Sequence, residues 1–120
     1  MKIRVTYNKT HNYLIGKYTG VLESGNVREY GIEILKWVRI HNCKRFMNDL
    51  REAVIKLSIT DLYYASSTAI MSEFDLTWRR AVLVKNYTKE MEFYEVTAAN
   101  KGLALKVFDS HEKALAWLLE

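Results

Sequence analysis

The sequence predicts an α/β fold in which an N-terminal β-hairpin precedes alternating helices and strands, giving a mixed, mostly parallel five-stranded sheet with about four helices. Three observations predict this class: a strand-like hairpin pattern at the start, a helical and strand periodicity that alternates after it, and one continuous apolar run rich in β-branched residues. Strands that alternate with helices are joined by right-handed crossovers, which place them parallel to one another.

The hairpin is predicted from alternation. Ile3, Val5 and Tyr7 alternate with polar residues at the period of a strand, and a second strand-like run extends from Tyr13 to Leu22. The polar residues 8–12 lie between the two runs and suit a turn. We therefore expect two antiparallel strands at one edge of the sheet.

A long amphipathic helix is expected next. Asn26, followed three residues later by Glu29, has the spacing of a helix start. The apolar side chains on one face then recur at helical intervals: Val27, Tyr30, Ile34 and Val38.

Three further strands are expected. Arg45–Leu50 is predicted to be a short strand that gives way to an irregular segment up to Leu57. Ala81–Val84 is continuously apolar, which suits a central strand buried on both faces. Leu103–Phe108 has the pattern of the last strand.

Capping residues place the other helices. Ser58 and Asp61 have the spacing of a capping box, with Thr60 as the competing cap, and the helix that follows is expected to reach about Ser72. Two more helices are expected, one from Thr88 to Asn100 with Gly102 as a left-handed terminator, and one capped by Asp109 or Ser110 with Ala114, Leu115 and Leu118 on its apolar face.

Composition restricts the class of protein. The 120 residues contain no repeat or linker-like segment, so residues 1–120 are expected to form one domain. The net charge is +4, but basic and acidic residues are interspersed, so we expect no nucleic-acid partner. No signal-peptide core and no run of about 18 apolar residues is present, and the single cysteine closes no internal bridge. We therefore expect a cytoplasmic protein without a membrane span.

Short motifs follow one another along most of the chain: Arg45–Arg51, Ser58–Tyr63, Trp78–Val82, Phe93–Glu95, Ala99–Gly102, Lys106–Phe108 and Glu112–Leu118. In this order they resemble the bacterial SpoIIAA-like group of STAS (sulphate transporter and anti-sigma factor antagonist) domains. The resemblance implies a STAS-like fold and a non-enzymatic role in regulation or ligand sensing.

The resemblance also singles out the start of the second predicted helix. Characterised members of the family carry a phosphorylatable serine there, in an Asp-Ser-x-Gly motif. This chain has Ser58-Ile59-Thr60-Asp61 instead and lacks the glycine. Ser58 or Thr60 is therefore either a phosphoacceptor or a helix cap, and capping, which stabilises a helix by about 1 kcal/mol, is the favoured interpretation.

The sequence contains few candidates for catalysis. His41 and Cys43 are two residues apart, but no third group is evident to orient the imidazole, so Cys43 is expected to be a small buried residue. The pair Asn48-Asp49, near the predicted end of a strand, suits a ligand site, although the Asp49 carboxylate equally suits a hydrogen bond to the next loop. The 3 histidines lack the spacing of metal ligands, and we expect neither a metal nor a cofactor.

The segment from Ser58 to Trp78 is the predicted recognition face, because its apolar side chains fall on more than one face of a helix. Its candidate residues for a ligand or partner are Asp61, Tyr63, Tyr64, Phe74 and Trp78, together with Asp49.

These residues leave three hypotheses. The first is a regulatory module that binds a protein partner or a second copy of itself. The alternative is a domain that binds or senses a small apolar, lipid-like ligand. The third is a hydrolase that depends on Cys43 or Asp49.

Overall fold

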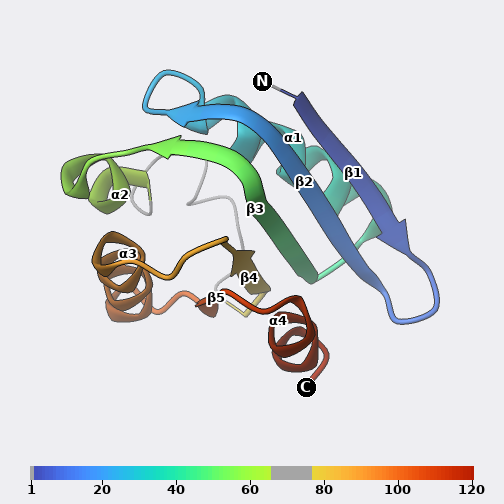
Figure 1. Ribbon diagram of the computed structural model, residues 1–120. Helices are drawn as coiled ribbons and strands as arrows, with labels where there is room; N and C mark the ends of the chain where they lie inside the picture. Colours follow the sequence, from blue (N-terminus) through green and yellow to red (C-terminus); the bar gives the residue numbers. More distant parts are fainter. Residues whose placement is uncertain (1, 66–76) are drawn as a thin grey trace.

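The computed structural model describes residues 2–65 and 77–120. In this part of the chain, five strands form one sheet in the order β1-β2-β3-β4-β5, and only the β1–β2 pair is antiparallel. Helix α1 lies behind the sheet in Figure 1, and α4 lies in front of it. The mixed, mostly parallel sheet with an N-terminal hairpin confirms the predicted fold class.

The hairpin joins β1 (Lys2–Asn8) to β2 (Tyr13–Glu23), with Asn8 opposite Tyr13. Its turn is closed by side chains, since the Tyr7 hydroxyl donates to Asn12 Oδ1 at 2.7 Å. Asn12 has a positive φ of 54°, a conformation that asparagine tolerates better than most residues. The predicted polar turn is therefore confirmed.

Helix α1 (Val27–His41) starts where the sequence predicts, but Asn26 acts differently from a side-chain cap. Its amide accepts from the backbone N–H of Glu23 at 3.0 Å and donates to the carbonyl of Val21 at 2.7 Å. Asn26 thus fixes the turn between β2 and the helix. The helix buries four side chains against the sheet: Tyr30, Ile34, Leu35 and Val38.

Strand β3 (Arg45–Lys56) has 12 residues, so the predicted end at Leu50 and the predicted irregular segment up to Leu57 are wrong. The pairing of β3 with β2 shifts at a bulge between Lys17 and Thr19. A bulge adds one residue to a strand and exchanges the positions that face the core. Before the bulge, the even-numbered apolar residues of β3 face the larger apolar core, and after the bulge the odd-numbered ones do. A search for simple alternation therefore does not recognise the second half of the strand.

Helix α2 spans Ile59–Ala65, and the rest of the helix predicted up to Ser72 lies outside the described residues. Strand β4 (Arg79–Leu83) pairs with β3 on one side and β5 on the other, and Val82 is buried as predicted. The strand is internal, although β3 rather than β4 is the middle strand. Val84, also buried, follows the end of the strand.

The last two helices begin at the predicted caps. Thr88 precedes α3 (Lys89–Asn100), and its side chain accepts a hydrogen bond from the third helical N–H. Ser110, one of the two predicted caps, does the same for α4 (His111–Leu118). None of the helices in the described part of the chain is long and apolar enough to cross a membrane.

The sheet separates two apolar layers because neighbouring residues of a strand point to opposite faces. The larger layer lies among α1, α2, α3 and the sheet, whereas α4 covers part of the other face. The smaller layer contains Tyr13, Met47, Ala81, Leu83, Ala114 and Leu118.

Strand β5 (Leu105–Phe108) is an edge strand and begins two residues later than the predicted Leu103. Gly102, with φ 80°, ends the preceding helix as predicted. The Glu95 carboxylate accepts from the backbone N–H of Val107 at 2.6 Å, so a helix side chain satisfies a donor on this edge.

Glu95 also provides a test of this protection. Its other carboxylate oxygen accepts from the Tyr87 hydroxyl at 3.0 Å, and burial together with the hydrogen bond and charge of Glu95 raises the pKa of Tyr87 to about 12. We expect Glu95→Ala to speed hydrogen exchange at Val107 about tenfold and to lower the pKa of Tyr87 toward its usual value.

Amide-exchange NMR and a difference titration against Tyr87→Phe measure the two effects. Glu90→Ala, an exposed position on the same helix, is the matched control. Unchanged protection of Val107 in Glu95→Ala would contradict the protective role.

Candidate functional site

The N-terminus of α2 is closed by a reciprocal capping box. The backbone N–H of Asp61 donates to Ser58 Oγ at 3.1 Å, and the backbone N–H of Ser58 donates to Asp61 Oδ2 at 3.0 Å. Ser58 therefore occupies the predicted cap position, and Thr60 lies in the first turn with its side chain exposed. A phosphoacceptor role for either hydroxyl stays a prediction.

Helix α2 has an apolar side turned to solvent. Ile59 and Tyr63, one helical turn apart, are 53% and 46% exposed, whereas Leu62 is buried. Lys101 Nζ donates to the carbonyl of Tyr63 at 3.1 Å and lies 4.3 Å from the centre of its ring. The tyrosine is thereby held in place while its ring stays exposed. Ser58, Ile59, Asp61 and Tyr63 together are called the α2 surface below.

Among the other members of the predicted recognition face, the structure describes the position of the Trp78 side chain but not those of Tyr64 and Phe74. Trp78 is half-buried and packs against the main core. Phe74 and the side chain of Tyr64 lie outside the described residues. Of the predicted aromatic residues, the described structure thus places Tyr63 on the α2 surface.

Asp49 lies on the face of the sheet that points away from the larger core, and its side chain is 7% exposed. Arg51 binds it in a fork, with Nε 3.0 Å from Oδ1 and Nη2 2.9 Å from Oδ2, and the backbone N–H of Arg51 donates to Oδ1 at 3.2 Å. Asp49 therefore satisfies a donor at the bulge of β3. Burial raises the pKa of Asp49, but the hydrogen bonds and charge of Arg51, with the charge of Lys17, lower it below its usual value.

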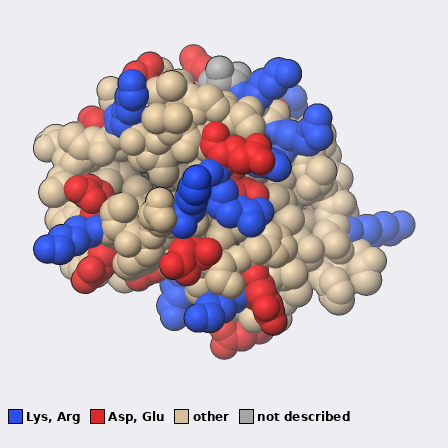
Figure 2. Space-filling model, viewed as in Figure 1, with Lys and Arg blue, Asp and Glu red and all other residues tan. Residues whose placement is uncertain are grey.

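Charges of both signs are interspersed on the face shown in Figure 2. Lys17 and Glu52, on neighbouring strands, form one ion pair at 3.2 Å. The Asp49 carboxylate is paired with Arg51, so neither of these two carboxylates is without a cationic partner.

The Cys43 thiol is fully buried, and its Sγ donates to the carbonyl of Arg45 at 3.1 Å. The His41 ring stacks on Tyr7, with ring centres 4.1 Å apart, and on Trp37, with centres 5.8 Å apart. Both residues serve packing between the hairpin and α1. Within residues 2–65 and 77–120, no cluster of three or more His, Cys, Asp or Glu side chains is placed to hold a metal ion.

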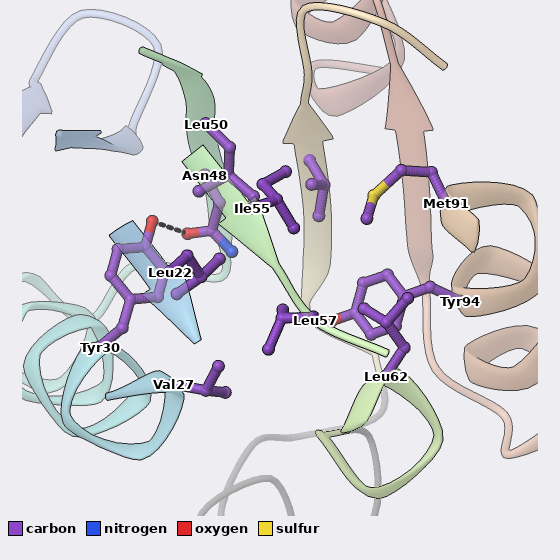
Figure 3. Close-up of a pocket in the computed structure, with 11 residues that line it drawn as sticks. Leu22, Val27, Tyr30, Asn48, Leu50, Ile55, Leu57, Leu62, Met91 and Tyr94 are labelled. Atoms are coloured by element: carbon purple, nitrogen blue, oxygen red, sulfur yellow. Dashed lines mark hydrogen bonds between the residues drawn. The ribbon is translucent and has the colours of Figure 1, made fainter. Parts of the chain in front are cut away.

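A cavity of about 80 Å³ lies where α1, α2 and α3 meet the sheet (Figure 3). Most of its lining is apolar, and its polar members are Asn48, Tyr30 and Tyr94. The Tyr30 hydroxyl donates to Asn48 Oδ1 at 2.7 Å. The sequence singled out Asn48 only together with Asp49, as a pair near the end of a strand. The two side chains point to opposite faces of the sheet, and the position of Asn48 between Phe46 and Leu50 on the core side was the signal that separates them.

Gly16 allows the Tyr30 hydroxyl to reach this position. A Cβ at residue 16 would lie 2.7 Å from Ile34 Cδ1 and 3.1 Å from the Tyr30 oxygen, closer than normal packing permits. The hydroxyl also lies 3.3 Å from the carbonyl oxygen of Gly16. Burial raises the pKa of Tyr30 well above its usual value, with smaller contributions from Tyr18, Asp49 and Tyr94, so the phenol remains a neutral donor.

The arrangement of hairpin, parallel strands and covering helices is the SpoIIAA-like fold. An anti-sigma factor antagonist from Mycobacterium paratuberculosis matches with a TM-score of 0.66 at 12% identity, over 99% of this chain and 94% of that chain. An uncharacterized protein of the DUF3478 family with a SpoIIAA-like fold, from Shewanella loihica, matches with a TM-score of 0.61 at 17% identity, over 98% and 92%.

A third similar structure is the Bacillus cell fate determinant SpoIIAA in its phosphorylated form, with a TM-score of 0.55 at 10% identity, over 97% of this chain and 98% of that chain. No protein-family model and no curated protein matches the sequence. The structural matches confirm the STAS-like, SpoIIAA-like fold that the sequence motifs predict.

The ion pair of Asp49 predicts a pH dependence of stability. Because its pKa is lowered on folding, Asp49 stabilises the fold above its unfolded pKa of about 4, and this contribution is lost as the pH falls through the lower folded value. We expect Asp49→Asn to reduce the free energy of unfolding by about 1–2 kcal/mol at neutral pH, with the difference from wild type closing below about pH 4.

Chemical denaturation at several pH values measures this difference. Glu52→Gln, which breaks a half-exposed pair on the same face, is the control and should change stability by less than about 1 kcal/mol. A difference for Asp49→Asn that stays constant down to about pH 2 would contradict the assignment.

Proposed function

We propose that the chain is a non-enzymatic, SpoIIAA-like regulatory module that binds a protein partner through the α2 surface. The observation that carries this proposal is the exposure of Ile59 and Tyr63 side by side on a helix whose opposite side is buried in the core. Each large apolar side chain contributes about 1.5–3 kcal/mol when it is removed from water. A partner that covers both residues would gain this free energy.

Polar groups around the two apolar side chains suit a protein partner. The Lys101 ammonium lies beside Tyr63, and the Asp61 carboxylate lies in the first turn of α2. An aromatic side chain held in place and surrounded by charged groups is typical of the residues that dominate protein interfaces. A protein with an apolar pocket and charges complementary to this rim would fit it.

The similar structures support a regulatory role. The proteins from Mycobacterium paratuberculosis and Bacillus are described as an anti-sigma factor antagonist and a cell fate determinant, respectively. A non-enzymatic role is also supported by the two candidate catalytic groups. The Cys43 thiol and the Asp49 carboxylate each form hydrogen bonds within the protein. A cytoplasmic location belongs to the same proposal.

Site-specific photo-crosslinking in cells tests the interface. A photoreactive residue at position 59 is compared with one at position 40, where Ile40 on α1 is similarly exposed at 59%. We expect a discrete adduct with another protein from position 59 only. Tyr63→Ser should remove the adduct, whereas Val96→Ser, a 51% exposed control on α3, should leave it unchanged.

Two outcomes would contradict this proposal. The same adducts from positions 59 and 40 would mean that the α2 surface has no special role. An adduct of twice the mass of the chain, and no other, would assign the surface to a second copy of the protein.

The folding of the Tyr63→Ser variant is checked by its thermal midpoint. This midpoint should stay close to that of wild type, because the side chain is half exposed.

A further inference from the structure

The cavity among α1, α2 and α3 combines an apolar lining with a polar group directed into it. The apolar side chains come from the strands and from all three helices: Leu22, Val27, Leu50, Ile55, Leu62 and Met91. Strands β2, β3 and β4 and helices α1, α2 and α3 all contribute side chains to the cavity. The cavity is therefore formed by the packing of the whole layer and not by the position of a single side chain.

Asn48 supplies the polar group. Its Oδ1 accepts from the Tyr30 hydroxyl at 2.7 Å, which leaves the amide nitrogen as the free end of the side chain. Figure 3 shows this nitrogen directed into the space between the lining residues. Within residues 2–65 and 77–120 no protein acceptor for Asn48 Nδ2 is observed. The cavity therefore offers an N–H donor next to apolar carbon.

The surroundings favour a neutral occupant. The cavity wall is mainly apolar, and burial raises the pKa of both tyrosines that line it, Tyr30 and Tyr94. For Tyr94 this effect of burial exceeds the opposing effect of the Arg80 charge, which lowers the pKa. An environment that disfavours a phenolate also disfavours a carboxylate, because both lose hydration there. A carbonyl oxygen accepts a hydrogen bond without bringing a charge.

The volume limits the size of the occupant. An apolar protein cavity of about 150 Å³ accommodates benzene, so 80 Å³ admits a smaller group. In proportion to the six carbon atoms of benzene, this volume admits about three or four non-hydrogen atoms. A whole lipid of the kind considered from the sequence is too large for this space.

From these observations we infer that the cavity is a binding site for a short-chain aliphatic carbonyl compound. Its oxygen accepts a hydrogen bond from Asn48 Nδ2, and its alkyl carbons contact Leu50, Ile55 and Met91. This site lies inside the domain and does not depend on the partner proposed for the α2 surface.

Three probes of the same size test the inference: acetone, its hydrocarbon isostere 2-methylpropene, and the anion acetate. Methyl NMR titration follows the resonances of Leu50, Ile55 and Val82, which line the cavity. We expect saturable shifts of these methyl groups with acetone, weaker binding of the hydrocarbon and the weakest binding of acetate.

Asn48→Leu should weaken acetone binding about threefold to tenfold and leave binding of the hydrocarbon unchanged or stronger. Because this variant also removes the acceptor of Tyr30, a second variant keeps the test independent of folding. Val82→Ile adds one methylene group inside the cavity and should weaken all three probes, whereas Val107→Ile, a strand position outside the cavity, should not.

Absence of saturable shifts with acetone would overturn the inference. Equal affinities of wild type for acetone and 2-methylpropene would also overturn it, because Asn48 would then contribute nothing to recognition.

Discussion

The hydrogen bond from the Tyr30 hydroxyl to Asn48 Oδ1 is the constraint on which the main layer of the structure depends. It crosses from α1 to β3 over the backbone of Gly16 in β2, and so joins three elements in one contact. In a buried setting, leaving either group without a partner costs about 1–3 kcal/mol. The bond therefore restricts how α1 can rotate on the sheet and which end of the Asn48 amide faces the cavity.

Helix α2 separates the two candidate sites. Its inner residue, Leu62, lines the cavity, while Ile59 and Tyr63 lie on the outside. A side chain as large as Tyr63 is usually placed in a core or an interface, and the contact with Lys101 keeps it ordered at the surface. The same short helix thus contributes to an internal site and to an external surface, although each rests on different residues.

Much of the fold could be predicted from local patterns. Alternation predicted the hairpin, and the spacing of Ser58 and Asp61 predicted a capping box that the hydrogen bonds confirm. The second half of β3 was missed because the bulge changes which residues face the core. The cavity and the orientation of the Asn48 amide could not be predicted, because the amide is oriented by Tyr30, which lies 18 residues earlier and meets it only after the sheet has formed.

A double-mutant cycle between Tyr30→Phe and Asn48→Leu tests most directly whether this bond organises the domain. The free energy of unfolding is measured for wild type, both single variants and the double variant. A direct bond predicts that the double variant loses less stability than the sum of the single losses, by about 1 kcal/mol or more. Losses that add to within about 0.3 kcal/mol would show that the two side chains act independently and would contradict the account.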